Sequence, residues 1–315
     1  MKKRVFLMAA AVAVAAVLGG CSGKSAAAPA DNTTAAEGST EASDGTKKAE
    51  TAEKVETSEA DKTVDDAAKD NGEEAGAEAG ASLEGGTFTV GFDQDFPPMG
   101  FVGDDGEYTG FDLELAAEVA KRLGKEFVAQ PIAWDAKDME LESGNIDCIW
   151  NGFTMTGRED KYTWTEPYMA NTQVVVVAAD SGIQSLDDLA GKVVEVQADS
   201  SAEAALKEDQ DLTGTFGTLQ TTPDYNTAFM DLQMGAVDAI AMDVVVAGYQ
   251  IEQRKADFVI LEETLAAENY AVGFKLGNDA LKDQVSEQLK AMAADGTLKT
   301  ISKKWFGSDI TTIGK

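Results

Sequence analysis

The chain has 315 residues and a formal net charge of −30 at pH 7, because 56 residues are Asp or Glu and only 26 are Lys or Arg. A field of this sign repels phosphate backbones and disfavours nucleic acid as a partner. The absence of histidine excludes a Ser-His-Asp triad, a Cys-His pair and a His-ligated zinc site, while the length allows two modest domains with cores.

The first 20 residues predict a secretory signal peptide. The basic start "MKKR" precedes an apolar run from Val5 to Leu18. A membrane-spanning helix is the alternative, but the run is shorter than the roughly 18 to 20 apolar residues that a bilayer requires. The ending "LGGC" resembles the bacterial lipobox, in which the cysteine is lipidated and becomes the mature N-terminus. We therefore expect a lipid on Cys21.

Residues 21–85 predict a disordered acidic tether. From Ser22 to Leu83 the chain consists mainly of Ala, Glu, Thr, Lys, Asp and Gly, with almost no large apolar residue. Such a segment cannot bury enough surface to offset chain entropy. A helical stalk is the alternative, since Ala and Glu favour helix, but no apolar stripe is present to pack. The other cysteine, Cys148, lies in an apolar run and is predicted to be a small core residue.

From residue 86 onward, short apolar runs alternate with amphipathic segments. Leu115, Val119 and Leu123 recur four residues apart and Gly124 follows them, which indicates a helix and its end. This first series predicts a strand at 87–92, a helix at 111–123, a strand at 127–133, a helix at 135–143 and a strand at 146–151. The order β-α-β-α-β implies a parallel sheet flanked by helices.

A second series of the same kind follows the apolar run 174–177. It predicts helices at 185–189, 201–207, 225–234 and 244–253, and strands at 192–197, 216–220 and 237–242. Near the C-terminus we expect a connecting strand at 270–274 and helices at 279–294 and 298–305. The chain is thus expected to form two α/β lobes, and the pattern does not say which lobe the final helices cover.

Four loops follow predicted strands, where open α/β sheets bind ligands: "DQDFPPM", "WNGFTMTGR", "QADSS" and "MDVVV". In the first loop, Asp93 and Phe96 are candidates, with an ordinary strand-to-helix turn as the alternative. In the second loop, the planar guanidinium of Arg158 matches a carboxylate. Its alternative is an ion pair with the neighbouring Glu159 or Asp160.

The two remaining loops belong to the predicted second lobe. Ser200 and Ser201 stand at a helix start that can receive an anionic group, although N-capping explains them equally well. Asp243 follows a strand directly, and capping the next helix is its alternative. Together the loops supply a carboxylate receptor, an ammonium receptor and aromatic surfaces, which a zwitterionic amino acid needs. Asp104-Asp105-Gly106 lacks the spaced acids of a calcium loop and predicts a hairpin turn. No metal or cofactor is expected.

Residues 86–307 resemble the bacterial extracellular solute-binding proteins of family 3, the receptors of polar amino-acid ABC importers. The resemblance runs in order through "VGFDQDFPPMGF", "GFDLELAAEVAKRLG", "SGNIDCIWNGFTMTGR", "GKVVEVQADSSAEAAL", "GAVDAIAMDVVVAGY" and "ADGTLKTISKKWFG". It implies a two-lobed α/β fold of the type II periplasmic-binding-protein kind, each lobe a sheet flanked by helices, with a hinge of two crossovers. Lobe 1 is expected at 86–177 and 270–315, and lobe 2 at 178–269.

The resemblance also implies a set of ligand-binding residues between the lobes. The implied arginine clamp for the α-carboxylate is Arg158, and the implied acid for the α-ammonium is Asp243. The other implied positions are Asp93 and Phe96 for the ligand side chain, Trp134 as a second aromatic wall, Gly152 and Thr154 for backbone and hydroxyl contacts, and Gln197, Ser200 and Ser201 in the second lobe.

One departure from the family pattern concerns the loop that ends in the arginine. The usual spacing from its first threonine is one residue longer than Thr154 to Arg158 here. Either the loop is shortened with Arg158 in place, or the hydroxyl of Thr156 substitutes for that of Thr154.

In function, the resemblance implies an extracytoplasmic, lipid-anchored and monomeric receptor that binds a free amino acid and docks on an ABC permease, without being an enzyme. Asp93 and Asp95 favour a polar or basic ligand side chain. The alternative from another class is a cyclohexadienyl or arogenate dehydratase on the same fold, with carboxylates as its only acids and bases. A sensory domain that signals through a partner is a third reading.

Overall fold

The structure is a computed structural model that describes residues 85–254 and 257–315. The predicted signal peptide, the lipid site at Cys21 and the tether up to residue 84 lie outside the described residues. Among the helices within the described ranges, none has both the length and the hydropathy needed to cross a bilayer.

The first lobe is built on a sheet of five strands in the order β5-β1-β6-β13-β7. Its strands are β1 Thr87–Phe92, β5 Glu126–Pro131, β6 Cys148–Ile149, β7 Thr163–Trp164 and β13 Gly273–Phe274. The pairs of β1 with β5 and with β6 are parallel, as the sequence predicts, and β13 pairs antiparallel with β6 and β7. Cys148 is fully buried in this lobe, which confirms it as a core residue.

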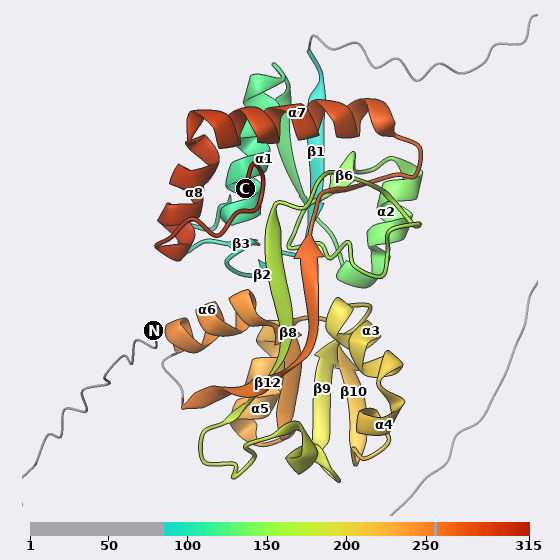
Figure 1. The fold of residues 1–315 in the computed structure, drawn as a ribbon, viewed down its shortest axis with the longest axis vertical. Helices are drawn as coiled ribbons and strands as arrows, with labels where there is room; N and C mark the ends of the chain where they lie inside the picture. The colour runs from blue at the N-terminus through green and yellow to red at the C-terminus, as the bar shows by residue number, and fades with distance from the viewer. Residues whose placement is uncertain (1–84, 255–256) are drawn as a thin grey trace, which may run out of the picture. The chain divides into compact units, whose positions relative to one another are not determined.

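The helices of this lobe come from both ends of the folded chain. They are α1 Phe111–Arg122, η1 Trp134–Ala136, α2 Lys137–Ser143, α7 Asp279–Asp295 and α8 Thr297–Phe306. Leu115 and Val119 of α1 are buried as their spacing predicts. Both α7 and α8 pack on α1 (Figure 1), so the C-terminal residues 270–315 return to lobe 1.

A small sheet of β2 Asp95–Phe96, β3 Gly100–Val102 and β4 Tyr108–Thr109 precedes α1. The predicted hairpin turn is confirmed, because β3 and β4 pair antiparallel around Asp104–Gly106. Gly110 then enters α1 with φ 144°, and a Cβ there would lie 2.3 Å from the Met99 carbonyl oxygen. This close approach fixes the loop that carries Phe96 against the start of α1.

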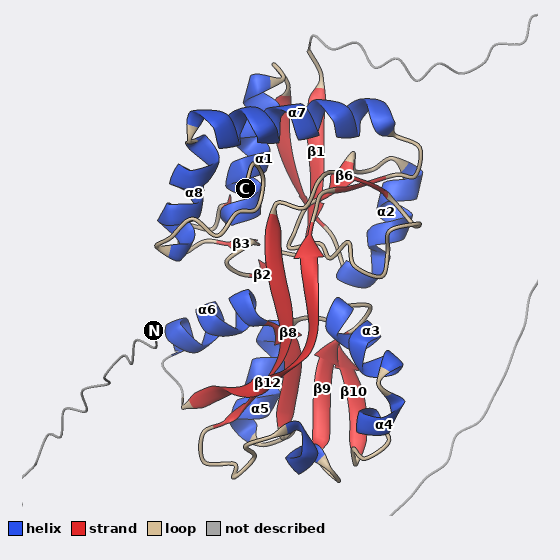
Figure 2. Cartoon of the chain, in the orientation of Figure 1, coloured by secondary structure: helices blue, strands red, loops and turns tan. Residues whose placement is uncertain are grey.

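The second lobe has a five-stranded sheet in the order β10-β9-β11-β8-β12. Its strands are β8 Met169–Ala178, β9 Val193–Gln197, β10 Thr218–Thr222, β11 Ala239–Asp243 and β12 Phe258–Tyr270. Its helices are η2 Leu186–Leu189, α3 Ser201–Glu208, α4 Gln210–Thr213, α5 Tyr225–Met234 and α6 Val244–Arg254, which flank the strands (Figure 2).

The apolar run Val174–Val177 shows why this sheet is covered on both faces. Val174 and Val176 pack in the core cluster that contains α5 and α6 residues, whereas Val175 and Val177 pack with residues of α3. Successive side chains of a strand point to opposite faces, so a strand buried on both faces is apolar at every position.

Two long antiparallel strands, β8 and β12, run between the lobes (Figure 1). Gln173 to Val177 pair with β11 and therefore belong to the sheet of the second lobe. The lobe boundary predicted after Val177 falls inside this pairing, so the first crossover lies nearer to Met169. Sequence reasoning missed β12 before residue 270, because this edge strand carries exposed acids such as Glu262 and Glu263.

Candidate functional site

The candidate site is a pocket lined by residues of both lobes. The lining residues are Phe96, Trp134, Asn151, Gly152, Thr154, Arg158, Gln197, Ser200, Ser201 and Asp243. Of the ten residues that the sequence nominates, the structure brings nine together here. Asn151 was missed, and Asp93 does not line this cavity.

Arg158 is positioned by a tight turn over Met155–Arg158. The Arg158 N–H donates to the Met155 carbonyl at 2.8 Å, and Gly157 at the third position has φ 78°. A positive φ at that position favours glycine, which explains "MTGR". The Arg158 carbonyl also accepts a hydrogen bond of 3.0 Å from the Trp164 indole. The shortened loop therefore forms a defined turn that ends at the arginine.

The guanidinium of Arg158 has neutral neighbours on several sides. It donates to the Thr154 carbonyl at 3.2 Å and to the Asp199 carbonyl at 3.4 Å, and it lies 5.5 Å above the centre of the Phe153 ring. Among the ion pairs of the described residues, none involves Arg158, so the pairing with Glu159 or Asp160 does not form. Its charge remains available at the cavity.

Gly152 meets the cavity through a backbone that has no room for a side chain. Its φ is 55°, and a Cβ there would contact Phe96 and Tyr270 at 3.1 Å. Its N–H donates to the buried carboxylate of Asp112 at 2.6 Å, and burial raises the pKa of Asp112 to about 7. The amide nitrogen of Gly152 is therefore already engaged.

The structure distinguishes between the two candidate threonines. Thr154 is buried, lines the cavity and donates its hydroxyl to Ser201 Oγ at 3.2 Å. Thr156 instead accepts a hydrogen bond from the Asn269 N–H at 3.1 Å and does not line the cavity. Shortening the loop thus keeps both Thr154 and Arg158 at the cavity.

The second lobe contributes the start of α3 and the end of β9. Ser200 caps α3 by accepting from the Glu203 N–H at 3.1 Å, which confirms the capping role predicted for this position. Ser201 Oγ accepts from Gln173 Nε2 at 2.9 Å as well as from Thr154. Gln197 is buried and donates to the Pro223 carbonyl at 3.0 Å.

Asp243, at the end of β11, is the acid of the cavity and is 3% exposed. It accepts hydrogen bonds from Asn171 Nδ2 at 2.7 Å, from Gln173 Nε2 at 2.8 Å and from the Tyr270 hydroxyl. Burial, reinforced by the negative charge of Glu268, raises the pKa of Asp243 well above its ordinary value. Its hydrogen bonds are thus to side chains of β8 and β12 rather than to the start of α6.

Two aromatic side chains form walls of the cavity, and both are largely buried. The ring of Phe96 lies 6.0 Å from that of Tyr225, centre to centre, which joins a loop of lobe 1 to a helix of lobe 2. Trp134 packs edge-on against Phe153 at 5.6 Å, and the same Phe153 underlies Arg158. The aromatic wall and the cation are therefore supported by one side chain.

Asp93 is held away from the cavity by contacts within the loop and to the other lobe. Its Oδ2 accepts from Gln197 Nε2 at 2.6 Å, and its Oδ1 accepts from the Asp95 N–H at 2.8 Å. Burial raises the pKa of Asp93 to about 6. Asp95 in turn accepts from Asn226 Nδ2 of lobe 2 at 2.8 Å. Both acids of "DQDF" thus connect the lobes.

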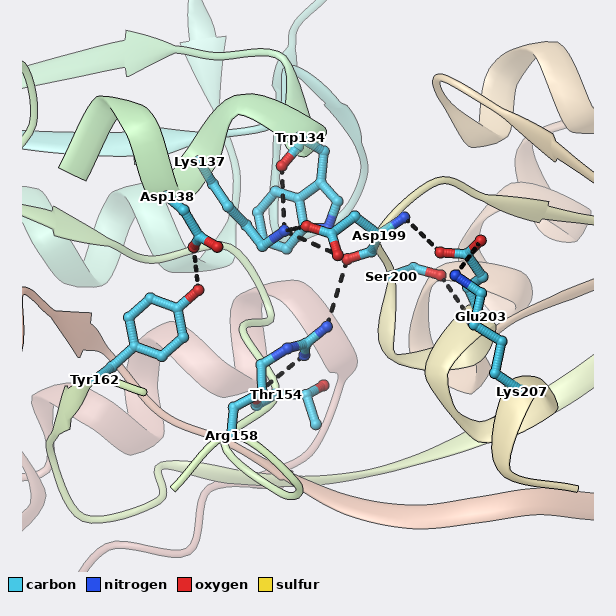
Figure 3. A network of polar contacts seen from close by, with 10 residues as sticks. All are labelled: Trp134, Lys137, Asp138, Thr154, Arg158, Tyr162, Asp199, Ser200, Glu203 and Lys207. Carbon is cyan, nitrogen blue, oxygen red and sulfur yellow. Dashed lines mark hydrogen bonds and ion pairs between the residues drawn. The ribbon is translucent and has the colours of Figure 1, made fainter. Parts of the chain in front are cut away.

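A buried lysine that sequence reasoning missed makes a further connection between the lobes. Lys137 of α2 is 1% exposed and forms an ion pair with Asp199 of lobe 2 (Figure 3). Lys137 Nζ and Arg158 Nη2 also donate to the Asp199 carbonyl, each at 3.4 Å. Burial lowers the pKa of Lys137, while the hydrogen bond to Asp199 raises it. We refer to Lys137 and Asp199 as the lobe latch.

The backbone of Asp199 fits this role. With φ 58° it is the one non-glycine residue with positive φ among the described residues. Asp and Asn tolerate this conformation better than other side chains do, so the sequence signal was a short polar residue in a loop. Lys137 and Asn151 carried no such signal, because they sit in a predicted helix and at the end of a predicted strand. Glu268 lies in β12, which the sequence analysis did not recognise before residue 270.

Two α/β lobes that are connected by two strands and enclose a polar cavity between them define a two-lobed ligand-binding protein. The fold is of the type II periplasmic-binding-protein kind, as solved neighbours show. The chain belongs to the bacterial extracellular solute-binding proteins, family 3, whose sequence pattern matches residues 88–308.

Individual relatives are similar over most of the folded part. The chain is 35% identical over 231 residues to the L-cystine-binding protein TcyJ of Escherichia coli, covering 72% of this chain and 85% of the relative. It is 32% identical to the L-cystine-binding protein TcyA of Bacillus subtilis, covering 78% and 91%. A solved substrate-binding protein of an ABC uptake transporter from Streptococcus pneumoniae, with bound histidine, is 36% identical, with a TM-score of 0.70 and coverage of 72% and 94%.

Replacing Asp199 with Asn tests the lobe latch. Asn retains the positive φ but removes the charge that pairs with Lys137. Because the Asp199 side chain is exposed, we expect the ion pair to stabilise the closed lobes by about 1 kcal/mol. This corresponds to roughly a fivefold change in the ratio of closed to open lobes. We expect faster hydrogen–deuterium exchange in the ligand-free protein, by about that factor, at residues 134–143 and 197–204. Asp180→Asn, an exposed acid of lobe 2, is the control, and equal exchange in both variants would contradict the latch.

Proposed function

We propose that this protein is the extracytoplasmic receptor of an ABC importer and that it binds one free polar or basic amino acid between its lobes. The proposal rests on the observation that a cation and an acid line the same cavity and that neither has a partner of opposite charge in the part of the chain that the structure describes. Arg158 has no acidic partner, and the buried Asp243 has no cationic partner, among the described residues. A zwitterion supplies the missing partner of each.

In this proposal the α-carboxylate of the ligand binds the guanidinium of Arg158, supported by the hydroxyl of Thr154 or Ser201. The α-ammonium binds Asp243, whose position is fixed by Asn171, Gln173 and Tyr270. Charge-assisted hydrogen bonds of this kind are about twice as strong as neutral ones. The remaining lining residues, Phe96, Trp134, Gly152, Gln197 and Ser200, surround the rest of the ligand, and Asp93 acts on it through Gln197.

The ligand side chain is proposed to be polar or basic. A dicarboxylic amino acid needs a second free cation, and the nearby Lys137 is paired with Asp199. The strongly acidic protein also disfavours an anionic ligand. Two similar relatives are named for binding L-cystine, so L-cystine is a candidate, and L-arginine represents the basic class.

The proposed cycle begins with capture on lobe 1, where Arg158 and the aromatic walls lie. Hinge motion about β8 and β12 then brings Asp243 and the start of α3 onto the ligand. The contacts between Gln197 and Asp93 and between Asn226 and Asp95 favour the closed form. The closed lobes dock on the permease, and ATP hydrolysis takes place on other subunits.

A dehydratase on the same fold is the second candidate, and the raised pKa of Asp243 is the observation that favours it. A protonated carboxyl in a cleft can act as a general acid. Binding remains the better proposal, because Asp243 already accepts hydrogen bonds from Asn171 and Gln173 and because similar relatives are named as binding proteins.

Calorimetric titration of the purified full-length protein with each common amino acid and L-cystine tests the function, after unfolding and refolding to remove bound ligand. We expect one-to-one binding of one or a few polar or basic amino acids, because only a zwitterion satisfies Arg158 and Asp243 together. We also expect each bound compound to be recovered unchanged after incubation with the protein. Binding of none of them would contradict the receptor proposal, and conversion of a prephenate or arogenate substrate would favour the dehydratase.

Truncation of either unmatched charge tests the site. Removing one partner of a buried charge pair costs about 2 to 5 kcal/mol, so Arg158→Ala and Asp243→Ala should each raise Kd by roughly thirtyfold or more. Arg122→Ala is the matched control, because Arg122 pairs with Glu118 and Asp295 on lobe 1 and does not line the cavity. If both site variants bind as tightly as the control, the site is assigned wrongly.

Membrane attachment through Cys21 is a separate proposal, which rests on the sequence alone. We expect the mature protein to carry the mass of a lipid on Cys21 and to fractionate with membranes, and Cys21→Ser to release it. Cys148→Ala changes the other cysteine of the chain, which is buried, and should leave attachment unchanged. A mature protein without added lipid mass would contradict the anchor.

A further inference from the structure

A second buried acid, Glu268, lies beside Asp243 in the ligand site. The two acids stand on β12 and β11, and β8 runs between these strands. In the strand registers, Asp243 is opposite Gln173 and Glu268 is opposite Asn171. The acids thus flank two amide side chains of the central strand.

Both acids bind the same two nitrogen atoms. Asn171 Nδ2 donates to Asp243 Oδ1 at 2.7 Å and to Glu268 Oε1 at 2.6 Å, and Gln173 Nε2 reaches the same two oxygens, each at 2.8 Å. The opposite ends of these amides, Asn171 Oδ1 and Gln173 Oε1, are buried without a partner. The amide nitrogens of Asn171 and Gln173 therefore point toward the two acids, and this orientation leaves the amide oxygens without hydrogen bonds.

The groups around the two acids do not neutralise them. Tyr270 from β12 and Tyr225 from α5 are titratable neighbours of Asp243, and burial raises the pKa of each well above its ordinary value, so both are uncharged. The charged side chains that line one cavity together with Glu268 are Arg158, Lys161, Asp199, Glu203, Lys207 and Glu208. Among the described residues, no ion pair joins a lysine or arginine to Asp243 or Glu268. Asp243 is 3% and Glu268 6% exposed, and two charges of one sign are unfavourable at such burial.

We propose that Asp243 and Glu268 hold one proton between them while the site lacks a ligand, and that an ammonium group of the ligand displaces this proton into solvent. The inference rests on the function proposed above and adds Glu268 to its site. The O–H bond of the shared carboxyl breaks, the proton passes to buffer, and the ammonium takes its place between the two carboxylates. No other reactant is required.

The place of Glu268 relative to the cavities supports this role. Asp243 lines the cavity already described, whereas Glu268 lines an adjacent one, and Arg158, Ser200 and Ser201 line both. The acid pair therefore reaches from one cavity to the other. A ligand with a second cationic group can meet Glu268 while its α-ammonium meets Asp243.

The sign of the pH dependence follows from the displaced proton. The free site binds a proton that the complex does not, so acid competes with ligand and affinity rises with pH. Where one proton is released per ligand, Kd falls by about tenfold per pH unit, and the slope vanishes once the free pair is deprotonated. Burial raises the pKa of Asp93 to about 6 and that of Asp112 to about 7, so these two groups also change protonation in this pH range. A variant is therefore needed to identify the group that releases the proton when the ligand binds.

Glu268→Gln provides that variant, because the amide keeps an acceptor for Asn171 and Gln173 but removes the shared proton. Glu262→Gln is the matched control on the same strand, where the side chain is exposed. The full-length proteins are titrated with L-arginine and with L-cystine between pH 5 and pH 7.5, in two buffers of different ionisation enthalpy. Thermal unfolding verifies that each variant is folded.

We expect close to one proton released per ligand at the acid end for the parent and for Glu262→Gln, and a distinctly smaller value for Glu268→Gln, in which burial alone raises the pKa of Asp243. Equal proton release by the parent and Glu268→Gln would overturn the proposal, as would a parent that binds ligand without releasing protons. The parent measurement decides the matter even if Glu268→Gln is unstable. Failure of the parent to bind any amino acid would instead overturn the receptor function on which the proposal rests.

Discussion

The organising constraint of this protein is the separation of unlike charges that would otherwise neutralise each other. Arg158 is held by carbonyl oxygens and an aromatic face, and Asp243 by amide and hydroxyl groups. Burying a charge without its counter-charge is unfavourable, and burial raises the pKa of Asp243 for this reason. In the proposed function, a zwitterion removes the imbalance at both ends, so the same feature that weakens the empty site gives it affinity for its ligand.

The buried and interlobe acids have two different structural roles, and their sequence context does not distinguish one role from the other. Asp243 lines the cavity between the lobes and Glu268 lines an adjacent one, whereas Asp93, Asp95 and Asp199 accept hydrogen bonds across the two lobes. Contacts of the second kind join the two lobes. In the proposed hinge motion they favour the closed form, and they thereby contribute to ligand affinity without touching the ligand.

Much of the fold was predictable because its strongest signals are local. The helices at 111–122, 225–234 and 279–295 follow apolar spacing and end at glycines, and the run Val174–Val177 follows from burial on two faces. The edge strand β12 lacks such a pattern, because its solvent-facing side carries acids that protect a sheet edge. Pairing with β8, rather than its own composition, makes it a strand.

The loops of the candidate site could be predicted from local sequence, because the residues that follow a buried strand are known once the strand is recognised. This identified Arg158, Ser200 and Asp243. The side chains that neighbour them depend on how distant segments pack in three dimensions. Glu268 meets Asp243 because β8 lies between their strands, and Lys137 of the first lobe meets Asp199 of the second lobe across the space between them. Such contacts join segments far apart in the chain, and no local pattern of charge or hydropathy encodes the partner of a given residue.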